Sequence, residues 1–339
     1  MTTKIYFCTN RKPNRKSNPT RFGKHFSHDG LANLRFGLAE VTDNGYSLNV
    51  AKERLVHKHD GQCTDHQKSV LGSLELFSGL RHQMKEHHQD TIVFIHGYNV
   101  DFSEALDSAA KLARNFSSLH DGQGVNVVLF SWPSDGSMMP WLAYSNDRRD
   151  AAASGPAFAR GILKLAEFLR SAHPDEVCEQ RIHLVAHSMG NYVLRHALQE
   201  ILHQCSGALP RLFDEIFLMA ADEDDDAFEH AHKLMRLPRL ARRVNVYFNR
   251  GDKAMAVSDM TKGNPDRLGD DGPRAPFQVP AKVVQVDCTR VTAGLVQHSY
   301  FVDEKRVVRD MARVLKGEED HLIEGREFLR DRNRYVISD

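Results

Sequence analysis

A serine separates an apolar run from an amphipathic one in RIHLVAHSMGNYVLRHAL, residues 181–198. The pattern predicts a buried strand followed directly by a helix. A serine at such a corner, with small neighbours two positions away on either side, is typical of a nucleophile elbow. Those neighbours are Ala186 and Gly190. We therefore predict that Ser188 is the nucleophile of an acyl-transfer reaction; the competing interpretation is a serine that only caps a helix.

A second segment that could take part in this chemistry is TIVFIHGYN, residues 91–99, which places a His-Gly-Tyr-Asn loop directly after a predicted strand. Gly97 lets the backbone turn, so that the amide N–H of Tyr98 can point at a developing oxyanion beside the amide of Met189. Losing one such donor typically costs about 3–4 kcal/mol of transition-state stabilisation. The alternative interpretation is a glycine turn that merely ends a strand.

An acid and a histidine should follow the serine in that order. Two acids qualify, Asp252 in YFNRGDKAM and Asp222 in the acidic run ADEDDD. We favour Asp252, because Asp222 opens a predicted helix, where carboxylates are stabilised whatever their role. The base is predicted to be His298, which is alone between His232 and His321. Its Nε2 would accept the serine proton while the acid holds the other ring nitrogen.

The elements that must position these groups alternate along the chain. Short apolar runs that read as strands buried on both faces occur at 91–97, 125–132, 181–188, 215–220, 244–250 and 282–289. Amphipathic stripes predict helices around 102–116, 162–169 and 192–201. Strand and helix in alternation predict an α/β fold, with a mostly parallel, doubly wound sheet and helices on both faces.

The ends of the chain depart from this alternation. Residues 4–10 and 34–41 are expected to form two edge strands, and a short amphipathic helix is expected over 228–240. The last part of the chain is highly charged and reads as a solvated helix and tail. We therefore expect a single domain over residues 1–315 and a charged C-terminal tail over 316–339.

Two aromatic residues follow the predicted strand at 125–132 and are candidate substrate contacts. These are Trp132 and Tyr144, with Trp141 and Asp147 close to them in sequence. Loops at the carboxyl ends of parallel strands gather the ligand site in such sheets. Aromatic packing and helix capping are the alternative roles.

Composition limits the partners. Forty-five basic residues balance forty-five acidic ones, so no global field favours nucleic acid or an anionic membrane. No apolar run reaches the roughly 18 residues of a membrane span, and the N-terminal apolar stretch is too short for a signal peptide. Five scattered cysteines and the histidine-rich segments 57–66 and 82–88 lack the spacing of metal ligands. We expect a cytoplasmic protein with no metal and no cofactor.

The motifs taken together are similar to those of a known family. TNR (9–11), FIHGYN, FSWPS, LVAHSMGNYVL, YFNRGDKAM and QHSYF occur in this order over about residues 4–315. The chain resembles an uncharacterised bacterial α/β-hydrolase family, a domain of unknown function. The resemblance implies the α/β-hydrolase fold and a triad of Ser188, Asp252 and His298, and it implies no substrate. Ala186 departs from the glycine of the wider superfamily, which would tighten the elbow.

The sequence therefore predicts a serine hydrolase of the esterase or lipase type. It would cleave a small-molecule carboxylic ester or thioester through an acyl-enzyme. The same triad could instead transfer the acyl group to another alcohol or cleave an amide. A hypothesis of another class is a non-catalytic protein that uses this fold to bind a ligand or partner, because a fold does not determine a function. The acyl chain length and the oligomeric state are open at this point.

Overall fold

The structure is a computed structural model that describes most of the chain. The described ranges are 2–28, 30–31, 33–51, 72–119, 124–134, 140–171, 178–205, 209–252, 266–292 and 298–338, with the backbone alone at 118–119 and 140–143. The histidine-rich segment 57–66, which we expect not to bind a metal, lies outside these ranges.

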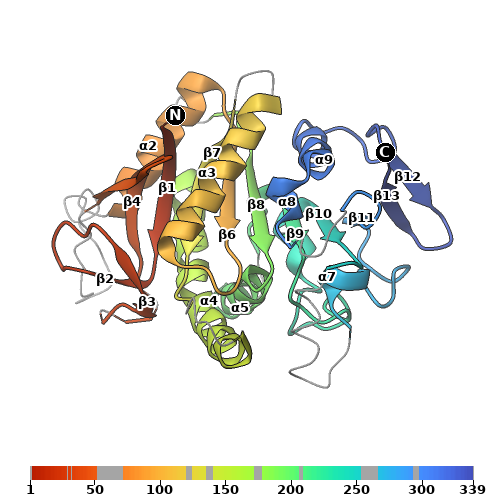
Figure 1. Cartoon of the computed structure of the whole chain (residues 1–339), viewed down its shortest axis with the longest axis horizontal. Helices are drawn as coiled ribbons and strands as arrows, with labels where there is room; N and C mark the ends of the chain where they lie inside the picture. The colour runs from red at the N-terminus through yellow and green to blue at the C-terminus, as the bar shows by residue number, and fades with distance from the viewer. Residues whose placement is uncertain are drawn as a thin grey trace.

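One large mixed sheet organises the described residues, in the strand order β12-β13-β11-β10-β9-β8-β6-β7-β1-β4-β5 (Figure 1). Its strands are β1 (Thr3–Thr9), β4 (Arg35–Thr42), β5 (Gly45–Val50), β6 (Thr91–Ile95), β7 (Asn126–Ser131), β8 (Ile182–His187), β9 (Phe213–Met219), β10 (Ala241–Phe248), β11 (Val283–Asp287), β12 (Arg326–Leu329) and β13 (Arg334–Ile337). The strands from β13 to β1 in this order pair in parallel, whereas β4, β5 and β12 pair antiparallel. The predicted mostly parallel sheet is confirmed.

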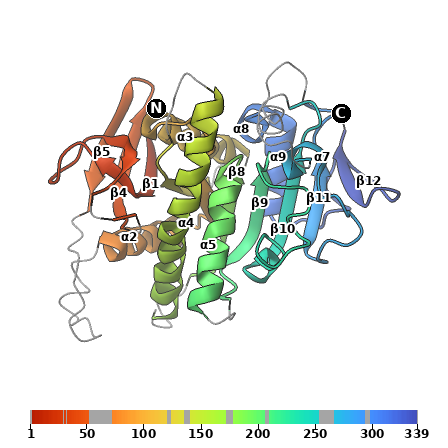
Figure 2. The same ribbon diagram turned by 90° about the horizontal axis from the view of Figure 1, so that it is seen from below.

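Helices cover both faces of this sheet (Figures 1 and 2). One face carries α2 (Gly72–His87), α4 (Pro140–Arg170) and α5 (Gly190–Gln204), and the other carries α3 (Phe102–Leu119), α8 (Tyr300–Asp303) and α9 (Lys305–Leu315). Two apolar cores result because side chains alternate across the strands: in β8, Leu184 packs into one core and Val185 into the other. Both faces of the central strands are therefore buried, as their continuous apolar runs predict.

The predicted helices are present, and most of them are longer than their apolar stripes. The stripes at 102–116, 162–169 and 192–201 belong to α3, α4 and α5. None of the described helices is long and apolar enough to cross a membrane. The prediction of a helix over 228–240 is wrong: the segment consists of turns and the short 3-10 helix η2 (Leu237–Arg239). Pro238 within this stretch removes a backbone donor that a longer helix would need.

The expected edge strands are interior strands of the sheet. β1 lies between β7 and β4, and β4 lies between β1 and β5. The N-terminal edge is β5, which returns from β4 through a tight hairpin that pairs Thr42 with Gly45. Exposed and half-buried positions alternate along β5. This alternation is typical of a strand with only one covered face, and it provides a weaker signal than an apolar run.

The prediction of a solvated tail over 316–339 is also wrong. β12 and β13 form a hairpin that joins the main sheet, with β13 parallel to β11. Both strands are short and carry charged residues, but the side chain of Arg326 is fully buried. Its Nε lies 2.6 Å from Asp310 Oδ1, and its Nη1 lies 2.7 Å from Asp320 Oδ1. These ion pairs allow the Arg326 guanidinium to be buried, although a charged segment predicts exposure to solvent.

A separate two-stranded sheet follows β1. It consists of β2 (Arg11–Pro13) and β3 (Phe22–Phe26), which pair antiparallel. Because β1 is parallel to β7, β6 and β8, this hairpin begins at the same edge of the main sheet as the loops that follow β6 and β8. One further short helix, α7 (Leu268–Asp271), follows the segment between β10 and β11 that lies outside the described residues.

Candidate active site

The backbone at Ser188 is strained. This residue lies between β8 and α5 with a φ of +51°, in the left-handed region, where a residue other than glycine costs about 1–3 kcal/mol. Its amide donates to the Met219 carbonyl at 2.9 Å, and its carbonyl accepts from the amides of Asn191 at 3.1 Å and Asp222 at 3.2 Å. Hydrogen bonds from neighbouring segments thus hold the serine at a sharp strand-to-helix corner.

Small residues on both sides allow this corner to form. A Cβ atom on Gly190 would lie 2.6 Å from the Ile95 carbonyl oxygen and 2.7 Å from that of His96, closer than any side chain tolerates. Ala186 is fully buried and pairs with Ile95 of β6 in the parallel register. The first turn of α5 therefore rests directly on the end of β6, which brings the two strand ends and their loops together.

The His-Gly-Tyr-Asn loop packs against the elbow. A Cβ atom on Gly97 would lie 3.0 Å from Ser188 Cβ, which is tighter than most side-chain contacts, so glycine favours this close approach. His96 stabilises the turn: its Nδ1 donates to the Gly97 carbonyl at 2.8 Å, and its Nε2 accepts from the Trp132 amide at 3.2 Å. Burial lowers the pKa of His96 to about 3, so the ring is neutral and can accept at Nε2. Tyr98 follows Gly97 in the chain, so its backbone lies next to the elbow.

Arg11 supports this loop from behind, a role that spacing and periodicity do not reveal. Its guanidinium is buried, donates to the Val100 carbonyl at 2.7 Å and to Ser131 Oγ at 2.9 Å, and lies 3.4 Å from His96 Nε2. Burial lowers the pKa of Arg11 to about 10, which leaves it charged at neutral pH. The TNR motif is the signal in the sequence that could have identified it.

Asp252 and His298 form a hydrogen-bonded pair at this edge of the sheet. Asp252 follows β10 in a turn in which its amide donates to the Asn249 carbonyl at 3.1 Å, and its buried carboxylate lies 2.7 Å from His298 Nδ1. The His298 carbonyl in turn accepts from His187 Nε2 at 3.0 Å, and the two imidazole centroids are 4.7 Å apart. Since His187 precedes Ser188, the Asp252–His298 pair lies beside the strand-to-helix corner that carries the serine.

The hydroxyl of Ser188 makes no hydrogen bond to another described residue. Catalytic hydrogen bonds are often long before the substrate binds, so this geometry is compatible with a nucleophile at rest. The neighbouring His187 is neutral, because burial, with the charge of His298 as a smaller contribution, holds its pKa well below the usual range. The elbow thus carries no positive charge of its own next to the serine.

The competing acid, Asp222, has different partners. The Tyr144 hydroxyl donates to its two carboxylate oxygens at 3.0 and 2.8 Å, and Arg267 Nε lies 3.6 Å away. The Tyr144 ring also meets Tyr98 edge to face, with centroids 5.8 Å apart. Asp222 therefore orients Tyr144 next to the His-Gly-Tyr-Asn loop, while the carboxylate that meets the imidazole belongs to Asp252.

The two predicted substrate contacts differ in their surroundings. Trp132 is fully buried, stacks on the His96 ring with centroids 5.2 Å apart, and donates from its indole nitrogen to the His96 carbonyl at 3.0 Å. Its expected place in the substrate pocket is corrected to a packing role, which an indole takes when its N–H finds a buried acceptor. Tyr144 is 4% exposed and lies beside Tyr98. The side chain of Trp141 lies outside the described residues.

Two further acids next to the elbow are buried and paired. Glu223 is paired with Arg195 at 3.2 Å, and burial raises the pKa of Glu223 to about 7. Asp147, fully buried, accepts from the Asn99 amide at 3.0 Å and from the Ser134 hydroxyl. The Asp147 carboxylate thus holds the backbone that follows β6, whereas Glu223 Oε1 is buried without a hydrogen-bond partner among the described residues.

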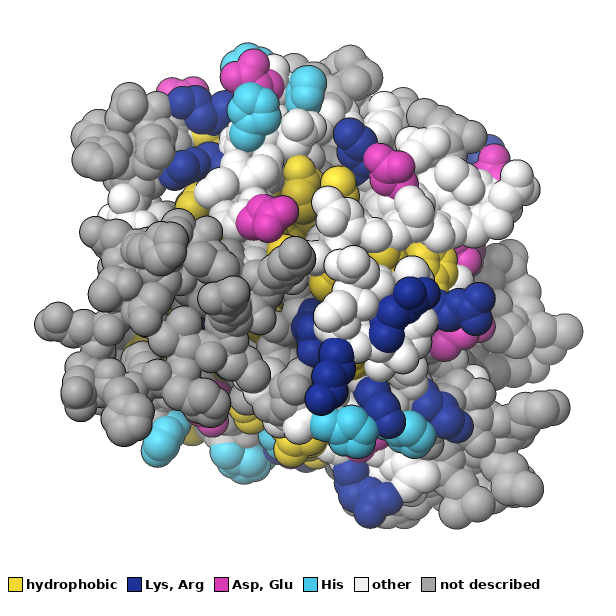
Figure 3. Space-filling view, turned by 90° about the vertical axis from the view of Figure 1, so that its left-hand side faces the viewer, with side chains coloured by type: hydrophobic (Ala, Val, Ile, Leu, Met, Phe, Trp, Pro, Cys, Tyr) yellow, Lys and Arg dark blue, Asp and Glu magenta, His cyan; other side chains and the backbone are white. Residues whose placement is uncertain are grey.

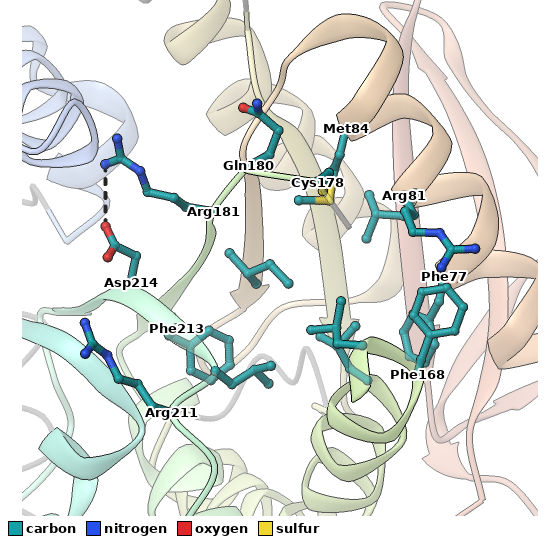
Figure 4. Close-up of a pocket in the computed structure, with 15 residues that line it drawn as sticks. Phe77, Arg81, Met84, Phe168, Cys178, Gln180, Arg181, Arg211, Phe213 and Asp214 are labelled. Atoms are coloured by element: carbon teal, nitrogen blue, oxygen red, sulfur yellow. Dashed lines mark ion pairs between the residues drawn. The ribbon is translucent and has the colours of Figure 1, made fainter. Parts of the chain in front are cut away.

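A cavity of about 380 Å³ lies at the opposite edge of the sheet, where β8 and β9 begin (Figure 4). Apolar side chains of α2 and α4 line it, and Arg81 stacks on Phe168 at 4.7 Å. On its far side Arg181 faces Asp214 at 3.6 Å. Because Ser188 follows the carboxyl end of β8, this cavity is separate from the candidate active site.

Within the described ranges, no group of three or more His, Cys, Asp or Glu side chains is arranged to hold a metal ion. The histidines at 82–88 lie at the end of α2 and just beyond it, where most of their neighbours are exposed.

Comparison with known proteins identifies a family whose sequence model matches most of the chain. A family model described as "Alpha/beta hydrolase of unknown function (DUF900)" matches residues 76–317. An uncharacterised protein of Nostoc sp. (strain PCC 7120), alr1448, is 33% identical over 140 residues, which cover 35% of this chain. The chain spans about a third of the length of that curated relative, 34%.

Proposed function

Because the chain belongs to the family of alpha/beta hydrolases of unknown function DUF900, we propose that it is a serine hydrolase that cleaves a carboxylic ester or thioester. One observation carries the proposal. The strained Ser188 lies at the edge of the sheet where the Asp252 carboxylate hydrogen-bonds the imidazole of His298 at 2.7 Å. A strained serine beside an oriented imidazole is the arrangement that acyl transfer needs.

The proposed reaction has two steps with one covalent intermediate. Ser188 Oγ attacks the substrate carbonyl carbon and gives its proton to His298 Nε2, while the amides of Met189 and Tyr98 stabilise the oxyanion. The tetrahedral intermediate then expels the alcohol or thiol, which takes the proton from His298. Water attacks the acyl-serine with His298 as base, releases the carboxylic acid and restores the hydroxyl. Asp252 accepts the Nδ1 hydrogen throughout and stabilises the imidazolium.

A fluorophosphonate probe tests the proposal, because it labels only activated serines. We expect mass spectrometry to find the adduct on Ser188, and we expect the Ser188→Ala variant to remain unlabelled. Ser17→Ala is the matched control: this serine is exposed at the tip of the β2–β3 hairpin, and its loss should leave labelling unchanged. A correctly folded wild-type protein that stays unlabelled would favour the non-catalytic binding alternative.

A series of p-nitrophenyl esters from short to long acyl chains defines the substrate class. Hydrolysis of short esters alone would indicate a shallow acyl site, and a rate that rises with chain length would indicate a long one. Thioester and amide analogues of the best ester separate the three reactions open to this triad. Loss of turnover in Ser188→Ala on the same substrate shows that the rate measured belongs to the site.

A further inference from the structure

Most cations of the N-terminal region gather on one exposed hairpin. Residues 1–28 contain no aspartate or glutamate. Within the hairpin formed by β2, β3 and their connecting turn, the exposed basic side chains are Lys12, Arg15, Lys16, Arg21 and Lys24, followed by the exposed His25 and His28. They form the basic patch at the lower right of Figure 3. The whole chain is neutral, so this patch is a local concentration of charge.

The basic patch lies at the edge of the sheet that carries the candidate active site. β2 begins two residues after β1 ends, and β1 runs parallel to β7. Arg11, the first residue of β2, contacts His96 at 3.4 Å, and the following Gly97 packs on Ser188. A surface bound to the hairpin would therefore face the same edge as the serine.

The hairpin is ordered by its own contacts. Asn14 Oδ1 accepts from the amides of Thr20 at 3.1 Å and Arg21 at 3.3 Å, and the Asn14 amide donates to the Arg21 carbonyl at 3.0 Å. Phe22 is buried against Phe102, with ring centroids 4.9 Å apart. The charged side chains consequently project from a preformed scaffold, and binding them costs little backbone entropy.

The chemistry of the hairpin favours a broad anionic surface over a small ligand. The cations lie on a projecting hairpin rather than in a concave pocket of the kind that small molecules occupy. Its exposed residues include no tryptophan, tyrosine or phenylalanine, the side chains that anchor protein interfaces and stack on nucleic-acid bases. Anionic lipid headgroups attract Lys and Arg side chains that lie near the membrane surface, and this hairpin exposes five of them. We propose that the basic patch docks this protein onto anionic phospholipid membranes with its active-site edge toward the lipid.

The turn of the hairpin, residues 14–20, is polar except for Pro19, which is buried. Docking is therefore electrostatic, without insertion of apolar side chains into the bilayer. The proposal goes beyond the proposed function and does not depend on it, because binding is measured without catalysis. If both hold, the protein acts on esters presented at a lipid surface.

Cosedimentation of the full chain with vesicles tests the docking. We expect binding to vesicles of equal parts phosphatidylserine and phosphatidylcholine, and no binding to pure phosphatidylcholine. Binding should disappear in 1 M salt, where the screening length falls to about 3 Å. Equal binding to both lipids, or binding that resists salt, would overturn an electrostatic docking surface.

Two charge-reversal variants locate the surface. Each exposed cation near an anionic membrane contributes about a five-fold change in binding, so the double variant Lys16→Glu/Lys24→Glu should bind at least roughly 30-fold more weakly. The matched control, Lys305→Glu/Arg309→Glu on the exposed face of α9, changes the net charge equally and should bind nearly as the wild type does. Equal losses in both variants would overturn the assignment to the hairpin.

One further measurement distinguishes membrane docking from the proposed catalysis, and another distinguishes lipid from other anionic partners. Ser188→Ala should bind vesicles like the wild type, whether or not the serine is reactive. If the wild-type protein did not cosediment with anionic vesicles but bound polyglutamate or single-stranded RNA at the same salt concentration, the lipid assignment would be wrong.

Discussion

Asp252 and Asp222 follow neighbouring strands, and their side chains meet different partners. Asp222 lies beyond β9 and accepts from Tyr144, whereas Asp252 lies beyond β10 and accepts from His298. Both carboxylates are buried, so burial does not distinguish a catalytic acid from a positioning one. The hydrogen-bond partner favours Asp252 in the proposed triad, because a carboxylate on Nδ1 holds the imidazole with Nε2 available for a serine proton.

Substitution of each acid by its amide tests this distinction. We expect Asp252→Asn to lower turnover of an activated acetate ester by about 10³- to 10⁴-fold, since an amide can stabilise the wrong tautomer of His298. Asp222→Asn keeps an oxygen acceptor for Tyr144 and should lower turnover by less than about ten-fold, the value of one hydrogen bond. A loss of orders of magnitude in Asp222→Asn alone would show that the acid is misassigned. Circular dichroism of both variants checks that they fold.

At the scale of elements, the elbow is a place where a helix rests directly on the end of a strand. Two positions make this possible, Gly190 at the start of α5 and Gly97 after β6. At Gly190, the backbone of β6 and the loop after it occupies the space that a Cβ atom would need. Because a backbone cannot move aside as a flexible side chain can, this position requires a glycine. The elbow can therefore be predicted from A-H-S-M-G, although Ala186 stands where many hydrolases have glycine.

A glycine-to-alanine pair measures the cost of this approach. Gly190→Ala should lower the free energy of unfolding by about 1–3 kcal/mol and abolish esterase activity, because the new methyl group would force α5 away from β6. The same change at Gly161 in α4 meets nothing closer than 3.4 Å and should raise stability by up to about 1 kcal/mol. Denaturant unfolding monitored by fluorescence gives both values. Equal behaviour of the two variants would contradict the close packing at the elbow.

At the scale of the whole molecule, the two edges of the sheet close the fold with antiparallel hairpins. β4 and β5 form one edge and β12 and β13 the other. The C-terminal hairpin is attached by Arg326, which meets Asp310 of α9 at 2.6 Å and the hydroxyl of Tyr247 in β10 at 3.0 Å. This contact links the last strands to the second core, so residues beyond 315 are part of the sheet.

Removing this buried charge tests whether the C-terminal hairpin stabilises the whole fold. Arg326→Met leaves the Asp310 carboxylate buried without its main partner and should lower the free energy of unfolding by about 3–5 kcal/mol. Arg332→Met, at an exposed position in the same hairpin, should change it by less than about 0.5 kcal/mol. Thermal unfolding compares the two. A stability of Arg326→Met close to that of the wild type would support a loosely attached tail.

The central strands could be predicted to within a few residues, for a simple physical reason. A strand covered on both faces needs apolar side chains at consecutive positions, and the runs at β6, β7 and β8 show this without reference to distant residues. The pattern does not predict β5, β12 and β13. β5 and β12 are edge strands with a solvated side, and β13 is an interior strand of only four residues. Charges such as Arg326 find their partners far away in the chain.

The sequence by itself determined the order of the chemical groups: a serine between small residues, a glycine loop before it, and an acid and a histidine after it. These features are local, because backbone strain and side-chain size act within a few residues. Only the tertiary structure decided which carboxylate meets the imidazole, that Trp132 is buried against His96, and that a basic hairpin lies at the edge of the candidate active site. Those outcomes depend on contacts between segments that the parallel sheet brings together, and no local pattern encodes such contacts.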